Sequence, residues 1–224
     1  YFVFIDKMNE ANPPMYKEHG LKVKASNLCT EITLHSDEFH TFTCVLSSMN
    51  LAKYDEWKDT DAIYNATIFL DCVASEFIQI GKGIKGLEKA VRATKHGRAL
   101  GLGTLGYHTY LQQNMLDIES LEAHAINIEI FSKLKKEAVR ASKMLAVKLG
   151  EPRWCKGHGV RNTHLLAVAP NSSSALVCGG VSQGIEPVYK NVFVQGSPAG
   201  EINRINPVLI DIMRVKDIYN KKTI

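Results

Sequence analysis

The chain has 224 residues, of which 45% are hydrophobic, so it can bury the core of one large domain. Its formal charge of +4 suits an anionic small ligand and falls short of the basic stripe of a nucleic-acid-binding protein. The five cysteines form no C-x-x-C pair, which argues against a secreted disulfide scaffold and favours a reducing, cytoplasmic compartment. Acidic residues interrupt the longest apolar run, which excludes a membrane-spanning helix.

The first quarter of the chain is expected to contain extended segments joined by a loop. The pattern predicts a strand over residues 1–5, a loop with two prolines over residues 9–20, and extended segments over residues 21–34 and 39–51.

Two helices are predicted from apolar residues that recur at spacings of three and four. The helix over residues 61–80 is expected to bury Ile63, Ala66, Leu70, Val73 and Phe77. The helix over residues 121–149, capped by Ser120, is expected to bury Leu121, Ala125, Ile128, Phe131, Leu134, Ala138, Ala141 and Leu145. Cys72 lies off the first stripe and is interpreted as structural.

The last third begins with a short buried strand, "THLLAVAP", that ends at Pro170. Residues 171–180 are expected to form a polar turn that enters a helix, and the remainder to form loops with two short apolar runs. Because strands and helices alternate, the sequence predicts an α/β fold with a parallel or mixed sheet.

Two stretches match the G-x-G-x-x-G pattern of dinucleotide-binding folds, at residues 81–86 and 101–106. The first follows a predicted helix instead of a strand, and the second is not followed by an acidic residue at the end of a second strand. Residues 101–106 are therefore interpreted as a tightly packed strand-to-helix turn. Cys155 and His158 have the spacing of half a zinc site, but no second pair accompanies them, so no metal site is predicted.

Polar side chains alternate in the segment "SNLCTEI", at Asn27, Cys29 and Glu31. In a strand these three would point to one side, toward solvent or toward a functional cavity. A lone cysteine is more often a small buried hydrophobe, and the residues alone leave this alternative open.

A second polar cluster, Pro170, Asn171, Ser172, Ser173 and Ser174, lies where a helix is expected to begin. Hydroxyl and backbone N–H groups at such a position bind phosphate, but the same residue types also serve as simple N-caps. The pattern alone does not separate the two readings.

Five stretches taken together, in the same order along the chain, resemble the catalytic core of the large subunit of class I ribonucleotide reductase, with phage-type enzymes the most similar. They are "SNLCTEI", "CVLSSMNL", "GLGTLGYHTYLQ", "GHGVRNTHLLAVAPNSSSA" and "QGIEP". The resemblance implies part of a ten-stranded α/β barrel with the catalytic cysteine on a loop inside it. Residues 1–224 are then expected to be a partial catalytic barrel domain, with the regulatory N-terminal and the C-terminal parts outside this chain.

The resemblance also implies a role for each residue of the two polar clusters. Cys29 would carry the thiyl radical that removes the 3′ hydrogen of a ribonucleotide, Glu31 would accept the 3′ hydroxyl proton, and Asn27 would hold the ribose hydroxyls. Cys44 would be one of two redox cysteines that form a disulfide, with its partner upstream of Tyr1. Residues 170–174 would bind the substrate phosphates.

The implied substrate is a ribonucleoside diphosphate, and the implied partners are a metal-containing small subunit that supplies the radical and the remaining pieces of the large subunit. No cofactor is expected in this chain itself, apart from Mg²⁺ that accompanies nucleotides such as ATP, and neither nucleic acid nor a membrane is an expected partner. Two alternatives stay open: an adenosylcobalamin-dependent class II reductase, and a non-catalytic fragment that binds other reductase chains.

Overall fold

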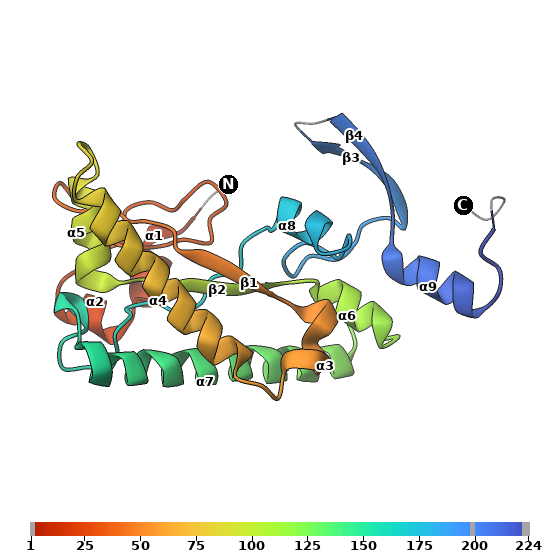
Figure 1. Ribbon diagram of the computed structural model, residues 1–224, viewed down its shortest axis with the longest axis horizontal. Coiled ribbons are helices and arrows are strands. Elements are labelled where there is room, and N and C mark those ends of the chain that lie inside the picture. The colour runs from red at the N-terminus through yellow and green to blue at the C-terminus, as the bar shows by residue number, and fades with distance from the viewer. Residues whose placement is uncertain (1–2, 198–199, 221–224) are drawn as a thin grey trace. The chain divides into compact units, whose positions relative to one another are not determined.

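The computed structural model describes residues 3–197 and 200–220 (Figure 1). The chain divides into two compact units. Unit 1 comprises Tyr1–Ser48, Trp57–Gly103 and Glu129–Ala169. Unit 2 comprises Met49–Glu56, Thr104–Ile128 and Pro170–Ile224.

Both units mix helices with short strands. Unit 1 holds α1 (Ile5–Glu10), α2 (Pro14–Glu18), α4 (Ala62–Gly81), α5 (Glu88–Gly97) and the 3₁₀ helix η2 (Arg153–Cys155). Unit 2 holds η1 (Leu51–Lys53), α6 (Tyr107–Gln113), α8 (Ser172–Val177), β3 (Val192–Ser197), β4 (Gly200–Ile205) and α9 (Pro207–Val215). Four elements have residues in both units: β1 (Leu46–Asn50), α3 (Tyr54–Trp57), β2 (Gly101–Leu105) and α7 (Leu121–Leu149). None of the helices in the described part of the chain is long and apolar enough to cross a bilayer.

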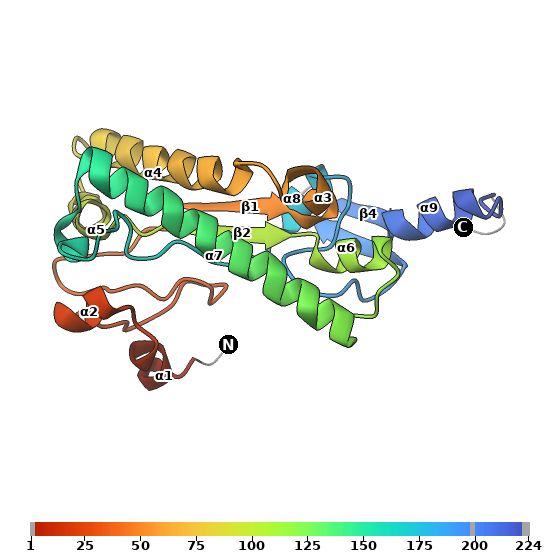
Figure 2. The ribbon, with the colours of Figure 1, turned by 90° about the horizontal axis from the view of Figure 1, so that it is seen from below.

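Strand β2 is the most deeply buried strand, with every residue buried. It pairs with β1, and Figure 2 shows the two arrows pointing the same way, with α4 and α7 beside them. Leu102 also forms a parallel bridge with Leu166. This approach requires Gly103, because a Cβ atom there would lie 2.1 Å from the carbonyl oxygen of Ala167.

The segment "GLGTLG" is a strand-to-helix turn, as its sequence predicts. Strand β2 ends at Leu105, Gly106 adopts a φ of +79°, and α6 begins at Tyr107. The other glycine-rich stretch begins at Gly81, the last residue of α4, which confirms that it follows a helix.

Helix α4 confirms the predicted helix, but its buried face is turned relative to the predicted stripe. Ile63 and Leu70 are buried as expected, whereas Val73 is 40% exposed. The buried positions are Ile63, Thr67, Leu70, Asp71, Ala74, Ile78 and Gly81. The observed face differs from the predicted stripe because it includes Asp71, and a prediction from apolar residues leaves out a charged residue.

Asp71 is the centre of a buried polar network in unit 1. Its carboxylate accepts hydrogen bonds from Arg98 Nε at 2.8 Å, Arg98 Nη2 at 2.9 Å, Arg161 Nε at 3.1 Å and Asn162 Nδ2 at 2.9 Å. Arg161 also donates to the carbonyl oxygens of Leu149, the last residue of α7, and of Gly150, which follows it. Two residues of the "GHGVRN" motif therefore join α4, α7 and the segment after α5.

Helix α7 has the predicted bounds, and Ser120 Oγ accepts the N–H of Ala123 at 3.1 Å as the predicted cap. The predicted stripe is only half right. Leu134, Ala138, Ala141 and Leu145 are buried, Phe131 is half-buried, and Leu121, Ala125 and Ile128 are exposed.

The predictions for the first segments were partly wrong. Tyr1 and Phe2 lie outside the described residues, and Ile5 begins α1 where a strand was expected. Asn9 explains the helix, because its side chain donates to the carbonyl oxygen of Ile5 and exchanges hydrogen bonds with the backbone of Val23. The expected loop over residues 9–20 contains α2, since a proline at the first helical position is favourable.

The predicted strands were wrong in three further places. Residues 21–34 form no strand, only a Val23–His35 bridge, and within residues 39–51 only Leu46–Asn50 form a strand. Residues 163–170 are mostly half-buried and contribute one bridge. The tail, expected to be loops, forms the antiparallel β3–β4 hairpin and α9, whose side-chain cap is Asn206.

Candidate functional site

The segment that carries Cys29 is a tight turn instead of a straight strand. Asn27 and Ile32 exchange two hydrogen bonds: the backbone N–H of Asn27 donates to the carbonyl oxygen of Ile32, and Asn27 Oδ1 accepts the N–H of Ile32 at 3.0 Å. The N–H of Thr30 donates to the carbonyl oxygen of Asn27. Thr30 adopts a φ of +65°. The expectation that Asn27, Cys29 and Glu31 alternate along a strand was therefore wrong, because the Asn27 side chain closes a turn. Cys29 lies in this turn and is exposed.

Glu31 follows the turn and reaches a cavity of about 60 Å³ in unit 1. Its Oε2 atom is buried and has no hydrogen-bond partner among the described residues. The cavity is also lined by Ile32, Thr33, Leu34, Thr43, Val45, Ala99, Leu100, Gly101, His164, Leu166 and Ala167. Burial lowers the pKa of His164 to about 4, so this ring is neutral near pH 7. A buried carboxylate oxygen without a donor is costly, and a hydroxyl group of a ligand would satisfy it.

Cys44 lies just before β1 and is electrostatically coupled to the turn. Although the residue is exposed, partial burial of its thiol raises its pKa, and electrostatic interactions with Glu31 and Cys29 raise it further. Cys29, Glu31 and Cys44 therefore lie near one another within unit 1, and their catalytic roles stay predictions.

We expect alkylation of Cys44 by iodoacetamide to begin at higher pH than that of an ordinary cysteine, because its raised pKa lowers the thiolate fraction. Replacing Glu31 with glutamine removes one negative charge and should move the alkylation midpoint to lower pH. Mass spectrometry of the Cys44 peptide measures the midpoint. The matched control, Glu76→Gln on the exposed face of α4, should leave it unchanged. An unchanged midpoint in Glu31→Gln would show that Glu31 and Cys44 are not coupled.

The polar cluster at residues 170–174 lies in unit 2, where α8 begins at Ser172 as predicted. Asn171 adopts a left-handed conformation with a φ of +59°, and its side chain makes no capping hydrogen bond. Asn171 Nδ2 instead donates to the carbonyl oxygen of Thr104 at 3.1 Å, and Ser172 Oγ donates to Gln183 Oε1 at 2.9 Å. Ser173 and Ser174 are exposed. Simple side-chain capping by Asn171 therefore does not explain this cluster.

Cys155 and His158 have different partners in the structure. Cys155 is fully buried beside Met15, and burial raises the pKa of its thiol to about 12. His158 Nε2 instead lies 3.0 Å from Glu18 Oε2. Cys72 is exposed on α4, off the buried face. The sequence interpretation missed another group of possible ligands, His35, Asp37 and His40, which the H-x-D-x-x-H spacing could have indicated.

Comparison with known proteins gives a consistent result across most of the chain. The family model described as ribonucleotide reductase, barrel domain, matches residues 1–157 and 153–223. The putative ribonucleoside-diphosphate reductase large subunit of Frog virus 3 is 40% identical over 210 residues, which cover 93% of this chain and 37% of that protein. The ribonucleoside-diphosphate reductase large subunit of Invertebrate iridescent virus 3 is 37% identical over 207 residues, which cover 92% of this chain and 32% of that protein. The chain thus spans about a third of the length of these relatives.

A solved structure gives the same result. The alpha subunit of the Actinobacillus ureae class Id ribonucleotide reductase aligns with a TM-score of 0.91 and 42% sequence identity. The alignment covers 99% of this chain and 41% of that one.

Proposed function

The chain belongs to the ribonucleotide reductase family, in its barrel domain, and on that premise we propose that it carries the active site of a class I ribonucleoside-diphosphate reductase. The resemblance stated from its motifs is confirmed, and the fold is part of the α/β barrel of that family. The catalytic activity, the substrate and the partners below are proposals for the complete protein.

The observation that carries this proposal is the position of Glu31. A buried carboxylate oxygen without a donor faces the small cavity, and the exposed thiol of Cys29 lies two residues away in the turn. The 3′ carbon of a ribose ring carries both a hydroxyl group and a C–H bond. A proton acceptor and a thiyl radical that lie side by side could act on these two groups. A general base must lie within hydrogen-bond reach of the proton that it removes.

We assign the roles as follows. The Cys29 thiyl radical removes the 3′ hydrogen of the ribonucleotide, and Glu31 accepts the proton of the 3′ hydroxyl. Asn27 uses its amide oxygen to hold the turn, so its Nδ2 amide is the group assigned to the ribose hydroxyls. Cys44 supplies reducing equivalents together with a second cysteine of the complete protein, and its raised pKa keeps it a thiol until it reacts.

The substrate phosphates are assigned to residues 170–174. The exposed serine hydroxyls can donate to phosphate oxygens, while Asn171 Nδ2 donates to the carbonyl oxygen of Thr104. The radical is assigned to a metal-containing small subunit, as in the class I family to which the chain is similar.

An assay of deoxyribonucleotide formation by the complete enzyme that carries this chain tests the proposal. With a ribonucleoside diphosphate, a dithiol reductant and the cognate small subunit, we expect product to form. Replacing the small subunit with adenosylcobalamin should give none. Product with adenosylcobalamin alone would establish the class II alternative, and no product under either condition would favour a non-catalytic fragment.

A further inference from the structure

Three metal-ligating side chains, His35, Asp37 and His40, converge between the Cys29 turn and Cys44. Their donor atoms lie within 4.8 Å of one another. His35 Nε2 lies 3.0 Å from Asp37 Oδ2, and His40 Nδ1 lies 2.9 Å from Asp37 Oδ1. We propose that these three residues bind a divalent transition-metal ion such as Zn²⁺. This proposal is independent of the catalytic roles assigned above.

The donor set and its spacing suit such an ion. Two imidazoles and one carboxylate are common zinc ligands, and three protein ligands leave a fourth tetrahedral position for water. Ligand atoms about 2.0–2.1 Å from a tetrahedral ion lie about 3.3 Å apart. The separation of 3.0 Å between His35 Nε2 and Asp37 Oδ2 therefore needs to widen by only a few tenths of an ångström. The remaining donor atoms start within 4.8 Å of these, so His40 Nδ1 would turn from Oδ1 toward the ion.

Each ligand already has an outer hydrogen-bond partner that would orient it toward an ion. His35 Nδ1 lies 2.9 Å from the carbonyl oxygen of Lys22 and 3.1 Å from the backbone nitrogen of the same residue, and His40 Nε2 lies 3.3 Å from His96 Nδ1. With protons on those outer nitrogens, both rings present a lone pair toward Asp37. The histidine ligands of metal sites almost always donate their second N–H in this way.

Asp37 is held in the same manner. Its Oδ1 atom accepts the backbone N–H groups of Phe39 at 2.8 Å and of His40 at 2.7 Å. These bonds fix the carboxylate and leave Oδ2 as its metal-binding oxygen.

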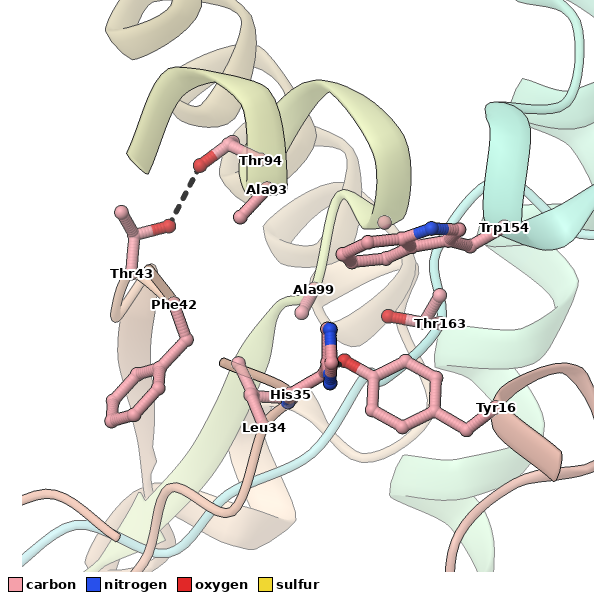
Figure 3. Close-up of a pocket in the computed structure, with 11 residues that line it drawn as sticks. Tyr16, Leu34, His35, Phe42, Thr43, Ala93, Thr94, Ala99, Trp154 and Thr163 are labelled. Carbon is pink, nitrogen blue, oxygen red and sulfur yellow. Dashed lines mark hydrogen bonds between the residues drawn. The ribbon is translucent and has the colours of Figure 1, made fainter. Parts of the chain in front are cut away.

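Aromatic rings enclose the site. The ring centre of Trp154 lies 5.8 Å from that of His35, 5.1 Å from His40 and 5.6 Å from His96. Figure 3 shows His35, Tyr16 and Trp154 around one small cavity, which Leu34 and Phe42 also line. A bound ion would therefore lie against apolar surface, close to a tryptophan that reports on it.

The ion would act on structure and would not contact the substrate. His35 bridges to Val23 at the base of the Cys29 turn, and His40 lies four residues before Cys44. A metal bound to both histidines would fix the link between the turn and Cys44.

Titration of the full, metal-free, thiol-reduced chain with Co²⁺ tests this proposal. We expect one equivalent to produce the visible absorption of a tetrahedral cobalt site, without a sulfur-to-metal charge-transfer band, and to quench Trp154 fluorescence. His40→Ala and Asp37→Asn should weaken binding by at least about tenfold, since loss of even an outer partner costs about 10–100-fold. The matched control is His158→Ala, which removes another histidine that is paired with an acid.

A second readout uses unfolding. Zn²⁺ should raise the unfolding temperature of the wild-type chain and of His158→Ala, but not of His40→Ala, because an ion that binds only the folded state stabilises it. A wild-type chain that shows no saturable one-equivalent cobalt signal would overturn the proposal. Unchanged affinity in both His40→Ala and Asp37→Asn would overturn it as well.

Discussion

Replacement of Cys29 with serine is expected to abolish ribonucleotide reduction by the complete enzyme that carries this chain. Serine keeps the size and exposure of the side chain in the turn, but its O–H bond is far harder to convert to a radical than the S–H bond of cysteine. Loss of a group that itself reacts typically lowers kcat by about 10⁴-fold or more. Product formation from a ribonucleoside diphosphate, measured by chromatography of nucleosides, gives the rate.

The matched control for this prediction is Cys72→Ser. Cys72 is also exposed, but it lies on α4, off the buried face and outside the Cys29 turn. Its replacement should leave the rate unchanged, while the unfolding temperatures of both variants should equal that of the wild type. Substantial reduction by Cys29→Ser would refute the radical role and favour a chain that only binds other reductase chains.

The long helices could be predicted from local pattern, whereas their exact buried faces could not. Periodicity gave the bounds of α7, and the bounds of α4 within one residue. It failed at Val73 because the buried face of α4 is organised around Asp71. That carboxylate is buried only because Arg98 and Asn162, which are 27 and 91 residues away, supply charge and hydrogen bonds. No window of local sequence contains those partners.

The residues of the candidate site could be named from the sequence, but their conformation could not. Alternation suggested a straight strand at Asn27, Cys29 and Glu31, whereas the Asn27 side chain closes a turn by accepting the N–H of Ile32. An Asn side chain that hydrogen-bonds to nearby backbone groups competes with strand pairing. Because this competition is local, the sequence alone could have indicated a turn at Asn27. Cys44 and Glu31 are 13 positions apart in the sequence and are coupled only through the folding of the chain, so only the structure reveals this coupling.

Replacement of Asp71 with alanine is expected to destabilise the chain by roughly 3–5 kcal/mol, the cost of breaking a buried ion pair. The loss would leave the guanidinium group of Arg98, which is buried with a side-chain exposure of 6%, without its carboxylate. It would also remove the acceptor for Arg161 and Asn162. Urea unfolding followed by Trp154 fluorescence measures the change in free energy. The matched control is Asp61→Ala, which breaks an exposed ion pair with Arg140 just before α4 and should change stability little.

The pH dependence of stability gives an independent check on Asp71. Burial alone would raise its pKa, but the hydrogen bonds and charge of Arg98, aided by Asn162 and Arg161, lower it overall. A carboxyl group with a lowered folded-state pKa contributes stability above its unfolded pKa, about 3.9, and loses it as the pH falls through the folded value. The difference in unfolding free energy between wild type and Asp71→Ala should therefore be full at neutral pH and shrink in acid. A difference that stays constant from neutral pH into acid would mean that packing, and not the charge of Asp71, stabilises the junction of α4, α7 and the segment after α5.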